Sequence, residues 1–334
     1  MMFSMQQRQF VAFMRHDQSV VNRFDEWLKK GLIKKYPDEI YRCHSMDWPL
    51  CRDASAPANV QMRLLTMLPQ GLDVHHWGTG PFVRHIQTCL SALSGVYIDE
   101  SVGIHEALRE RQFFTNPIVG VHNELQERPF GELDQVEPEA REQADPAFYA
   151  MNAVNPWMST PARGISHDQM AHTLTKPFLH DVAIRLGNGV YFTSRGQLLA
   201  LRYLMESLSI SDMAREDNKS SDDPWQRIPN CAIIVYSNFD FAAPEETPFS
   251  AFAYRMMLYP EGDNVTVIAQ ELIPRFEASK MRRVTSEVVV KPEVWMPTFS
   301  LIDLQNSVLG RETGLHRAYS KLSVELDDRH GSFA

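Results

Sequence analysis

Three short apolar runs near the C-terminal side constrain the fold of this sequence most strongly. They read CAIIVYSNF, FSAFAYRMMLYP and NVTVIAQELI, and the Glu261-Gly262-Asp263 segment joins the last two. Runs of this length that are rich in β-branched and aromatic residues are typical of strands, and the glycine-centred link is a hairpin signal. An earlier turn and strand, GNGVYFTS, leads into a helix that Ser194 caps. The pattern predicts an antiparallel or mixed sheet.

The N-terminal residues carry a different pattern, because their apolar side chains recur at helical spacing. We predict an amphipathic helix that ends near Gly31. Asp17 falls inside its apolar stripe, so either the helix is interrupted there or the carboxylate has a hydrogen-bonded partner. We expect this apolar stripe to pack on the rest of the same chain. The alternative hypothesis is that it docks into a groove of a partner protein. The candidate interaction residues are Phe3, Phe10, Phe13, Met14, Phe24 and Trp27.

These patterns together indicate an α+β protein. A helical region is expected over residues 1–121, with further helices at about 57–68, 81–93 and 102–114. An acidic segment with three prolines, residues 122–146, is the best candidate for a connector. Residues 147–334 are expected to form an α+β region around the antiparallel or mixed sheet.

The stretch SHDQMAHTLTKPFLHD supplies the first candidate metal ligands: His167, Asp168, His180 and Asp181. Ser166 and Gln169 fit a capping box, and Pro177 predicts a break followed by a second helix. Metal sites on helices commonly use two histidines on one face, at positions i and i+4. This stretch has no such pair, so the favoured interpretation is helix-end chemistry, with His167 bonded to the backbone.

The succession of His122, the two His-Asp pairs and Asp212 resembles the metal-dependent HD phosphohydrolases. That resemblance implies a divalent metal, with His122 as its first ligand and Asp212 as its last. A second candidate constellation lies in GLDVHHWGTG, where Asp73 and His75 precede an expected helix. The alternative function is therefore a metal-dependent hydrolase.

Composition bears on the other functional classes. A formal net charge of −9 argues against a broad nucleic-acid-binding face, which leaves only a weaker hypothesis built on Lys29–Lys35 and Arg282-Arg283. Four cysteines without a C-x-x-C pair suit a reducing compartment. The apolar runs are too short to cross a membrane, since a spanning helix needs about 20 residues. A soluble, cytoplasmic protein is expected.

Known catalytic fingerprints are absent from the sequence: it has neither a G-x-S-x-G elbow nor a phosphate-binding glycine loop. Sixteen methionines favour adaptable apolar contacts. The leading hypothesis is thus a non-enzymatic interaction or assembly protein without a cofactor, which binds a protein partner or a second copy of itself. A sequence without recognised motifs is typical of rapidly diverging viral proteins, so a phage-encoded accessory role fits.

Overall fold

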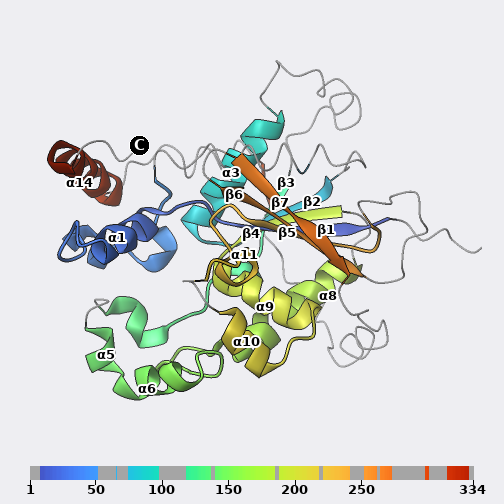
Figure 1. Ribbon diagram of the computed structural model, residues 1–334, viewed down its shortest axis with the longest axis horizontal. Coiled ribbons are helices and arrows are strands. Elements are labelled where there is room, and N and C mark those ends of the chain that lie inside the picture. Colours follow the sequence, from blue (N-terminus) through green and yellow to red (C-terminus); the bar gives the residue numbers. More distant parts are fainter. Residues whose placement is uncertain are drawn as a thin grey trace, which may run out of the picture.

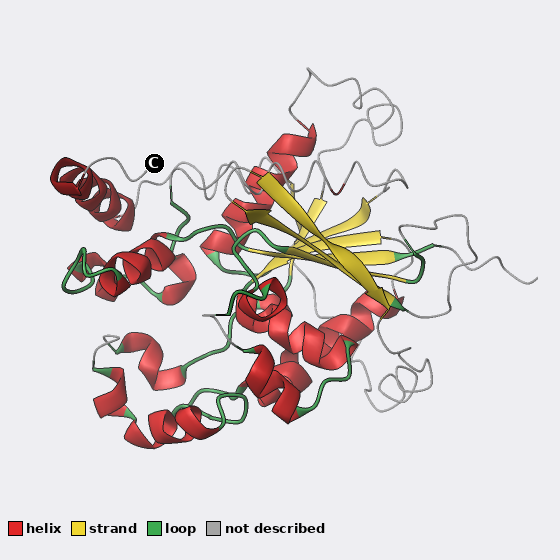
Figure 2. Ribbon diagram, viewed as in Figure 1, coloured by secondary structure: helices red, strands yellow, loops and turns green. Residues whose placement is uncertain are grey.

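The computed structural model describes residues 8–51, 65, 74–97, 118–136, 140–184, 188–217, 221–240, 252–261, 264–272, 298–300 and 314–330. Within these residues the chain forms a mixed sheet that has helices on both faces (Figures 1 and 2). The α+β class and the mixed sheet that the sequence predicts are confirmed. None of the described helices is long and apolar enough to span a membrane.

The sheet has the strand order β7-β6-β5-β1-β4-β2-β3-β8. Its middle strands β1, β4, β2 and β3 are parallel to one another. The flanking strands β5, β6 and β7 are antiparallel, as is β8 on the other side. The strands span β1 Phe10–Arg15, β2 Val74–Thr79, β3 Ile118–Val121, β4 Asn188–Thr193, β5 Ile233–Ser237, β6 Tyr254–Glu261, β7 Asn264–Leu272 and β8 Thr298–Ser300.

Helix α3 covers one face of the sheet, and α8 and α9 cover the other (Figure 1). A separate apolar cluster joins α1 to α14 at the side of the molecule. The helices are α1 Val20–Lys29, α3 Val83–Tyr97, α5 Arg141–Ala144, α6 Pro146–Val154, α7 His167–Met170, α8 Lys176–Ile184, α9 Arg195–Met205, α10 Ile210–Glu216, α11 Pro224–Arg227 and α14 Gly314–His330. Short 3₁₀ turns occupy Asp38–Arg42, Ser45–Asp47, Asn123–Leu125 and Gly131–Gln135.

The N-terminal segment corrects the predicted single helix, because it forms strand β1 and then helix α1. Phe10, Ala12 and Met14 pack toward α3, whereas Val11 and Phe13 pack toward α9. A central strand buried on both faces has a continuous apolar run, and here that run also matches the spacing of a helix. The interruption expected at Asp17 is present, because Ser19 begins α1 with a capping box.

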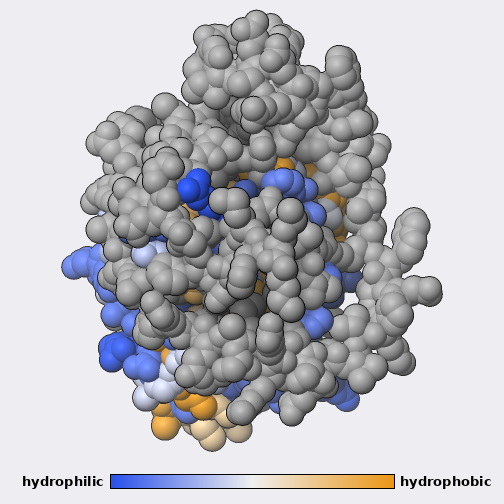
Figure 3. Space-filling view, turned by 90° about the vertical axis from the view of Figure 1, so that its right-hand side faces the viewer, coloured by the Kyte–Doolittle hydropathy of each residue, from blue (hydrophilic) through white to orange (hydrophobic). Residues whose placement is uncertain are grey.

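The predicted interaction surface is corrected as well. Phe10, Phe13, Met14, Phe24 and Trp27 are all buried within the chain's own body, and Phe3 lies outside the described residues. The apolar stripe therefore packs within the same chain, as expected. On the face shown in Figure 3 the described residues are mostly hydrophilic, and hydrophobic ones gather most clearly at its lower edge.

The predicted strands and hairpin near residues 231–273 are present as β5, β6 and β7, and Ser194 caps α9 as expected. The segment KLSVEL, expected as a strand, belongs to α14 instead. The N-terminal region is not purely helical, because it supplies β1, β2 and β3. The expected helices at 57–68 and 102–114 lie almost wholly outside the described residues. The proposed domain boundaries remain a prediction.

Residues 166–181 confirm the capping box but not the break. Ser166 Oγ accepts the Gln169 backbone N–H at 3.0 Å, and the Gln169 side chain accepts the Ser166 N–H at 2.8 Å. Pro177 is carried within a continuous helical stretch, because Ala171–Thr175 adopts a π-helix between α7 and α8. Such a turn shifts the hydrogen-bond register, and this accommodates a residue that lacks its N–H.

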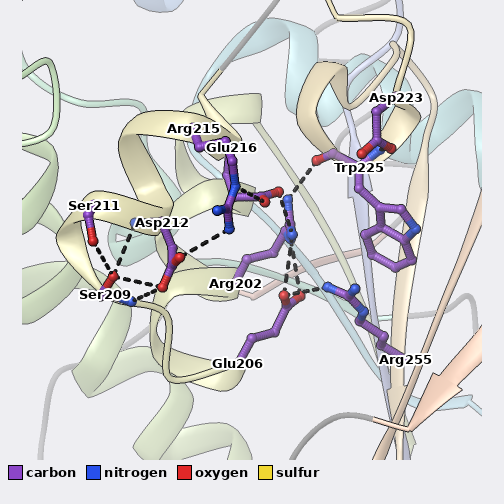
Figure 4. Close-up of polar contacts among 10 residues, drawn as sticks. All are labelled: Arg202, Glu206, Ser209, Ser211, Asp212, Arg215, Glu216, Asp223, Trp225 and Arg255. Atoms are coloured by element: carbon purple, nitrogen blue, oxygen red, sulfur yellow. Dashed lines mark hydrogen bonds and ion pairs between the residues drawn. The ribbon is translucent and has the colours of Figure 1, made fainter.

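A buried group of charges, which we call the Glu206 cluster, ties α9, α10, α11 and β6 together (Figure 4). The Glu206 carboxylate accepts hydrogen bonds from Arg202 at 3.1 Å and from Arg255 at 2.5 Å. Arg202 also binds Glu216 at 3.0 Å. Both guanidinium groups lie over the Trp225 ring, 5.4 and 4.2 Å from its centre. The buried carboxylates and guanidinium groups thus neutralise one another, and the cation–π contacts with Trp225 stabilise the guanidinium groups further.

Candidate active site

The carboxyl ends of the four parallel strands bring chemically reactive residues to one edge of the sheet. Arg15 is the last residue of β1, and His16 follows it. Arg195 comes shortly after the end of β4. The segment after β2 leads into α3, which carries Arg84 and His85, and the segment after β3 reaches Glu127. Ligands of open α/β sheets bind outside the carboxyl ends of the strands, where the chain connections diverge to opposite sides. The topology therefore marks this edge as a candidate site.

Glu127 is the centre of a group that we call the Glu127 cluster, together with Arg84, His16 and His85. Its Oε1 atom lies 2.6 Å from Arg84 Nη2 and 3.0 Å from Arg84 Nε. The Nε2 atoms of His16 and His85 each lie 3.7 Å from the same oxygen. The two imidazole rings stack with their centres 5.5 Å apart. One carboxylate thus faces a guanidinium and two buried histidines.

The His16 ring is held in a defined tautomer. Its Nδ1 lies 2.7 Å from the Asp17 carbonyl oxygen, which can only accept a hydrogen bond, so Nδ1 carries the proton. Burial lowers the pKa of His16 well below its ordinary value, and the Arg84 charge adds to this effect. His16 is therefore neutral near pH 7, and the lone pair on Nε2 is available for chemistry.

Glu127 remains ionised despite its surroundings. Burial raises the pKa of its carboxyl, but the Arg84 charge and the histidines outweigh burial and hold the pKa well below the usual range. A third of the side chain is exposed, toward the adjoining cavity. For His85, burial lowers the pKa to about 4, so this ring is also neutral. A Cβ atom at Gly80 would overlap the His85 ring, and this explains the glycine there.

The two arginines that follow β1 and β4 are positioned by α11. Residues 225–228 present four consecutive carbonyl groups, which helix ends leave without partners inside the helix. Trp225 O accepts from Arg202 at 2.6 Å, Gln226 O and Arg227 O accept from Arg195 at 2.7 and 2.9 Å, and Ile228 O accepts from Arg15 at 2.5 Å. Ile228 has a left-handed φ of 44°, which is unusual for a β-branched residue. This row of carbonyls connects the edge of the sheet to the Glu206 cluster.

A cavity of about 990 Å³ opens in front of His16 and Glu127. Four arginines, Arg15, Arg128, Arg195 and Arg227, are among the residues that line it, together with five carboxylate residues. The Nε atoms of Arg15 and Arg128 are buried and have no hydrogen-bond partner within the described residues. Burial lowers the pKa of Arg15 to about 10, which still leaves it charged near neutral pH. The cavity is therefore suited to an anionic ligand with planar or tetrahedral oxygens.

The structure does not bring the predicted metal ligands together. His75 is exposed on β2, where its Nδ1 accepts the Asn188 N–H at 3.1 Å, and Asp73 lies outside the described residues. Asp168 pairs with His172 at 3.6 Å, and His180 and Asp181 are half-buried on α8. In the part of the chain that the structure describes, the one group with metal-ligand spacing is His16, His85 and Glu127.

The ligands implied by the HD phosphohydrolase resemblance are also far from forming a site. His122 is buried against the rings of Phe178 and Tyr191, with ring centres 5.2 and 5.6 Å away. Asp212 caps α10 by accepting the Ser209 N–H at 2.9 Å. Local helix-end and core contacts account for both residues. The expectation that His167 bonds to the backbone is confirmed, because its Nδ1 lies 3.3 Å from the Pro156 carbonyl oxygen.

Sequence reasoning missed Arg15, His16, Arg84, Glu127 and Arg195. Each follows a strand, directly or within the next connection, and that position is the signal that could have identified them. It was hidden because the residues of β1 were assigned to a helix and β3 was not predicted. Glu127 was also assigned to an exposed connector.

Comparisons with known proteins found solved structures with similar folds. An Escherichia coli protein assigned as an alpha-ribazole-5'-P phosphatase is 14% identical, over 80% of this chain and 98% of that chain, with a TM-score of 0.47. The alpha-ribazole phosphatase from Shigella flexneri is 13% identical over 70% and 92%, with a TM-score of 0.46. A mycobacterial glucosyl-3-phosphoglycerate phosphatase is 15% identical over 71% and 94%, with a TM-score of 0.44. Neither a family model nor a curated protein sequence matches the chain.

The prediction of a non-enzymatic assembly protein is wrong. The described apolar side chains on which that prediction rested are buried in the chain's own core. In its place the structure shows a buried histidine pair, an ionised carboxylate and several guanidinium groups around one cavity. Such a concentration of buried titratable groups is characteristic of catalytic sites.

Proposed function

We propose that this protein is a phosphatase that hydrolyses phosphate monoesters through a phosphohistidine formed on His16. One observation carries the proposal: a neutral imidazole with its free Nε2 faces a cavity lined by arginines. A neutral histidine is a competent nucleophile, and guanidinium groups stabilise the charge on a transferring phosphoryl group. The cavity lining also carries the carboxylates Asp17, Asp25, Glu26, Glu127 and Asp217, and at least three of these are paired with cations: Glu127 with Arg84, Asp217 with Arg195 and Glu26 with Lys30.

The reaction follows from the protonation states of the site. His16 Nε2 attacks phosphorus, so the N–P bond forms while the bond from phosphorus to the ester oxygen breaks. The Asp17 carbonyl holds the Nδ1 proton and stabilises the positive charge that the ring gains. Water then attacks the phosphoryl group, the N–P bond breaks, and one water proton passes to Glu127, which lies 3.7 Å from Nε2 and is ionised. Glu127 afterwards releases this proton to solvent. Inorganic phosphate leaves and His16 becomes neutral again.

A divalent metal is the second candidate ligand. The ligand atoms of His16, His85 and Glu127 lie within 4.8 Å of one another, which permits a metal site with two nitrogens and one oxygen. However, the Glu127 carboxylate already forms an ion pair with Arg84 at 2.6 Å, and Arg15 lines the same cavity. A dication would therefore be repelled by the same guanidinium groups that attract a phosphate.

The test compares His16→Ala with His75→Ala, a control that removes an exposed histidine from the body of β2. Hydrolysis of 4-nitrophenyl phosphate should fall by about 10³-fold or more in His16→Ala, because the nucleophile is lost. The control should keep the activity of the unaltered protein, and treatment with EDTA should leave that activity unchanged. An active His16→Ala variant would rule out the proposal, and loss of activity in EDTA would favour the metal.

A cytoplasmic location is part of the proposal. None of the four cysteines, all of which the structure describes, forms a disulfide, and Cys51, Cys89 and Cys231 are buried. This supports the reducing compartment that the composition predicts.

A further inference from the structure

We propose that His167 is the catalytic acid that protonates the leaving group of the phosphate ester. This inference rests on the proposed phosphatase function and adds a residue to the same site. It starts from a chemical requirement. When the bond from phosphorus to an alkyl or phenyl oxygen breaks, the departing oxygen is a strong base and must receive a proton.

Several carboxylates that line the cavity are unsuited to supply that proton. Glu127 is held ionised by Arg84, and Asp217 forms an ion pair with Arg195. Glu26, which also lines the cavity, pairs with Lys30 at 2.6 Å. Burial raises the pKa of Glu26, but the pairing with Lys30 outweighs burial and lowers the pKa overall. These groups are therefore proton acceptors near neutral pH.

Asp17, a buried carboxylate beside His16, accepts the Gln18 backbone N–H at 2.6 Å. Other groups of the cavity wall are also unsuited. Guanidinium groups keep their protons in proteins, and burial raises the pKa of the Cys231 thiol well above its ordinary value. Asp25 accepts a hydrogen bond from Tyr36, and Lys29 is exposed at the end of α1. His16 is the nucleophile. His167 is the other histidine among the described residues that line the cavity.

The His167 ring is fixed in an orientation that suits an acid. Its Nδ1 lies 3.3 Å from the Pro156 carbonyl oxygen, and the ring stacks on Trp157 at 5.2 Å with an interplanar angle of 14°. Its Nε2 faces the first turn of α9, because a Cβ atom placed on Gly196 would lie 3.7 Å from it. Gly196 follows Arg195, and both line the cavity. The second ring nitrogen thus lies beside the first turn of α9, next to the residue whose guanidinium we expect to bind the anion.

Proton transfer preserves this arrangement. In the charged ring both nitrogens carry protons, and loss of the Nε2 proton leaves the neutral tautomer in which Nδ1 still donates to Pro156. Histidine is also the side chain whose ordinary pKa lies nearest to neutral pH. Arg128 and Arg195 line the same cavity, and Asp168, the next residue in the chain after His167, accepts a hydrogen bond from Tyr203 at 3.5 Å. The ester oxygen takes the Nε2 proton as the N–P bond forms on His16, and solvent then returns a proton to His167.

The experiment uses two substrates of similar shape that differ in their need for a proton. 4-Nitrophenolate is a stable anion and leaves without one, whereas phenolate is much more basic. His167→Ala should lose about 10²-fold in kcat on phenyl phosphate, a typical contribution of a general acid, and only about 3-fold on 4-nitrophenyl phosphate. His167→Gln should behave in the same way, which guards against a packing defect beside Trp157.

The matched control is His172→Ala. His172 lies in the same helical stretch, has a side chain that is 48% exposed and pairs with Asp168 at 3.6 Å, and is not among the residues that line the cavity. It should keep the activity of the unaltered protein on both substrates. Equal losses on both substrates in His167→Ala, or no loss on either, would overturn the role of His167. If His16→Ala still hydrolyses both substrates, the phosphatase mechanism itself fails, and that outcome is distinct.

Discussion

The Glu127 cluster and the Glu206 cluster each hold a carboxylate against buried arginine side chains, yet they differ in what surrounds that carboxylate. Every oxygen of Glu206 is engaged, by Arg202, Arg255 and the Tyr236 hydroxyl at 2.9 Å. Both clusters contain buried ring nitrogens that make no hydrogen bond within the described residues: Nδ1 and Nε2 of His85 in one, and Nε1 of Trp225 in the other. Only the Glu127 cluster opens on the large cavity. Neither buried charge nor an unused buried nitrogen by itself marks a site, therefore, and the two clusters differ in their access to a cavity that could hold a ligand.

The comparison predicts that Glu206→Gln chiefly harms stability. Removal of one partner from a buried ion pair leaves the other charges uncompensated, and here two arginines share the carboxylate. The free energy of unfolding should fall by about 3–5 kcal/mol in urea titrations. A loss of less than about 1 kcal/mol would show that the Glu206 cluster is not the structural element we infer.

Glu127→Gln should show the opposite balance, because this carboxylate is needed in its ionised form to accept a proton from water. Activity on 4-nitrophenyl phosphate should fall by about 10²-fold, while the urea midpoint changes much less than in Glu206→Gln. The phosphohistidine should accumulate in this variant, since its hydrolysis becomes slow. Unchanged activity would remove Glu127 from the mechanism.

The histidines of the Glu127 cluster should make stability depend on pH. In the unfolded chain histidine takes up a proton near pH 6.5, whereas burial holds the pKa of folded His16 far lower and that of His85 at about 4. The unfolded state therefore binds more protons over this window, and stability falls as pH drops from about 6.5 toward about 4. The free energy of unfolding should fall between pH 7.5 and pH 5 in both proteins. The fall should be about 1–2 kcal/mol smaller in His85→Gln than in the unaltered protein. Identical losses would contradict the buried neutral ring.

The sequence predicted the parts of the fold that rest on local signals. The β6–β7 hairpin, the Ser194 cap and the Ser166 capping box all follow from short patterns that neighbouring residues settle. The identity of β1 does not follow from a short pattern, because FVAFM fits the spacing of a helix as well as that of a strand buried on both faces. Only pairing with β4 and β5, more than 170 residues away, decides between them.

The site was harder to predict for a related reason. Its residues come from four separate strand ends, so no short motif contains them. The His-Asp dipeptides drew attention because they are adjacent in sequence, but helix geometry separates their side chains. His167 was correctly expected to bond to the backbone. Its place in the cavity wall depends on the packing of α7 against α9, which sequence spacing does not reveal.

The most direct test of the central claim is to capture the phosphoryl group on His16. The protein would be mixed with ³²P-labelled phosphate ester, quenched in alkali within one turnover, and digested so that the labelled peptide can be sequenced. We predict an alkali-stable, acid-labile phosphohistidine at His16, which is more abundant in Glu127→Gln and missing from His16→Ala. Label on another residue, or hydrolysis without any labelled protein, would contradict the account.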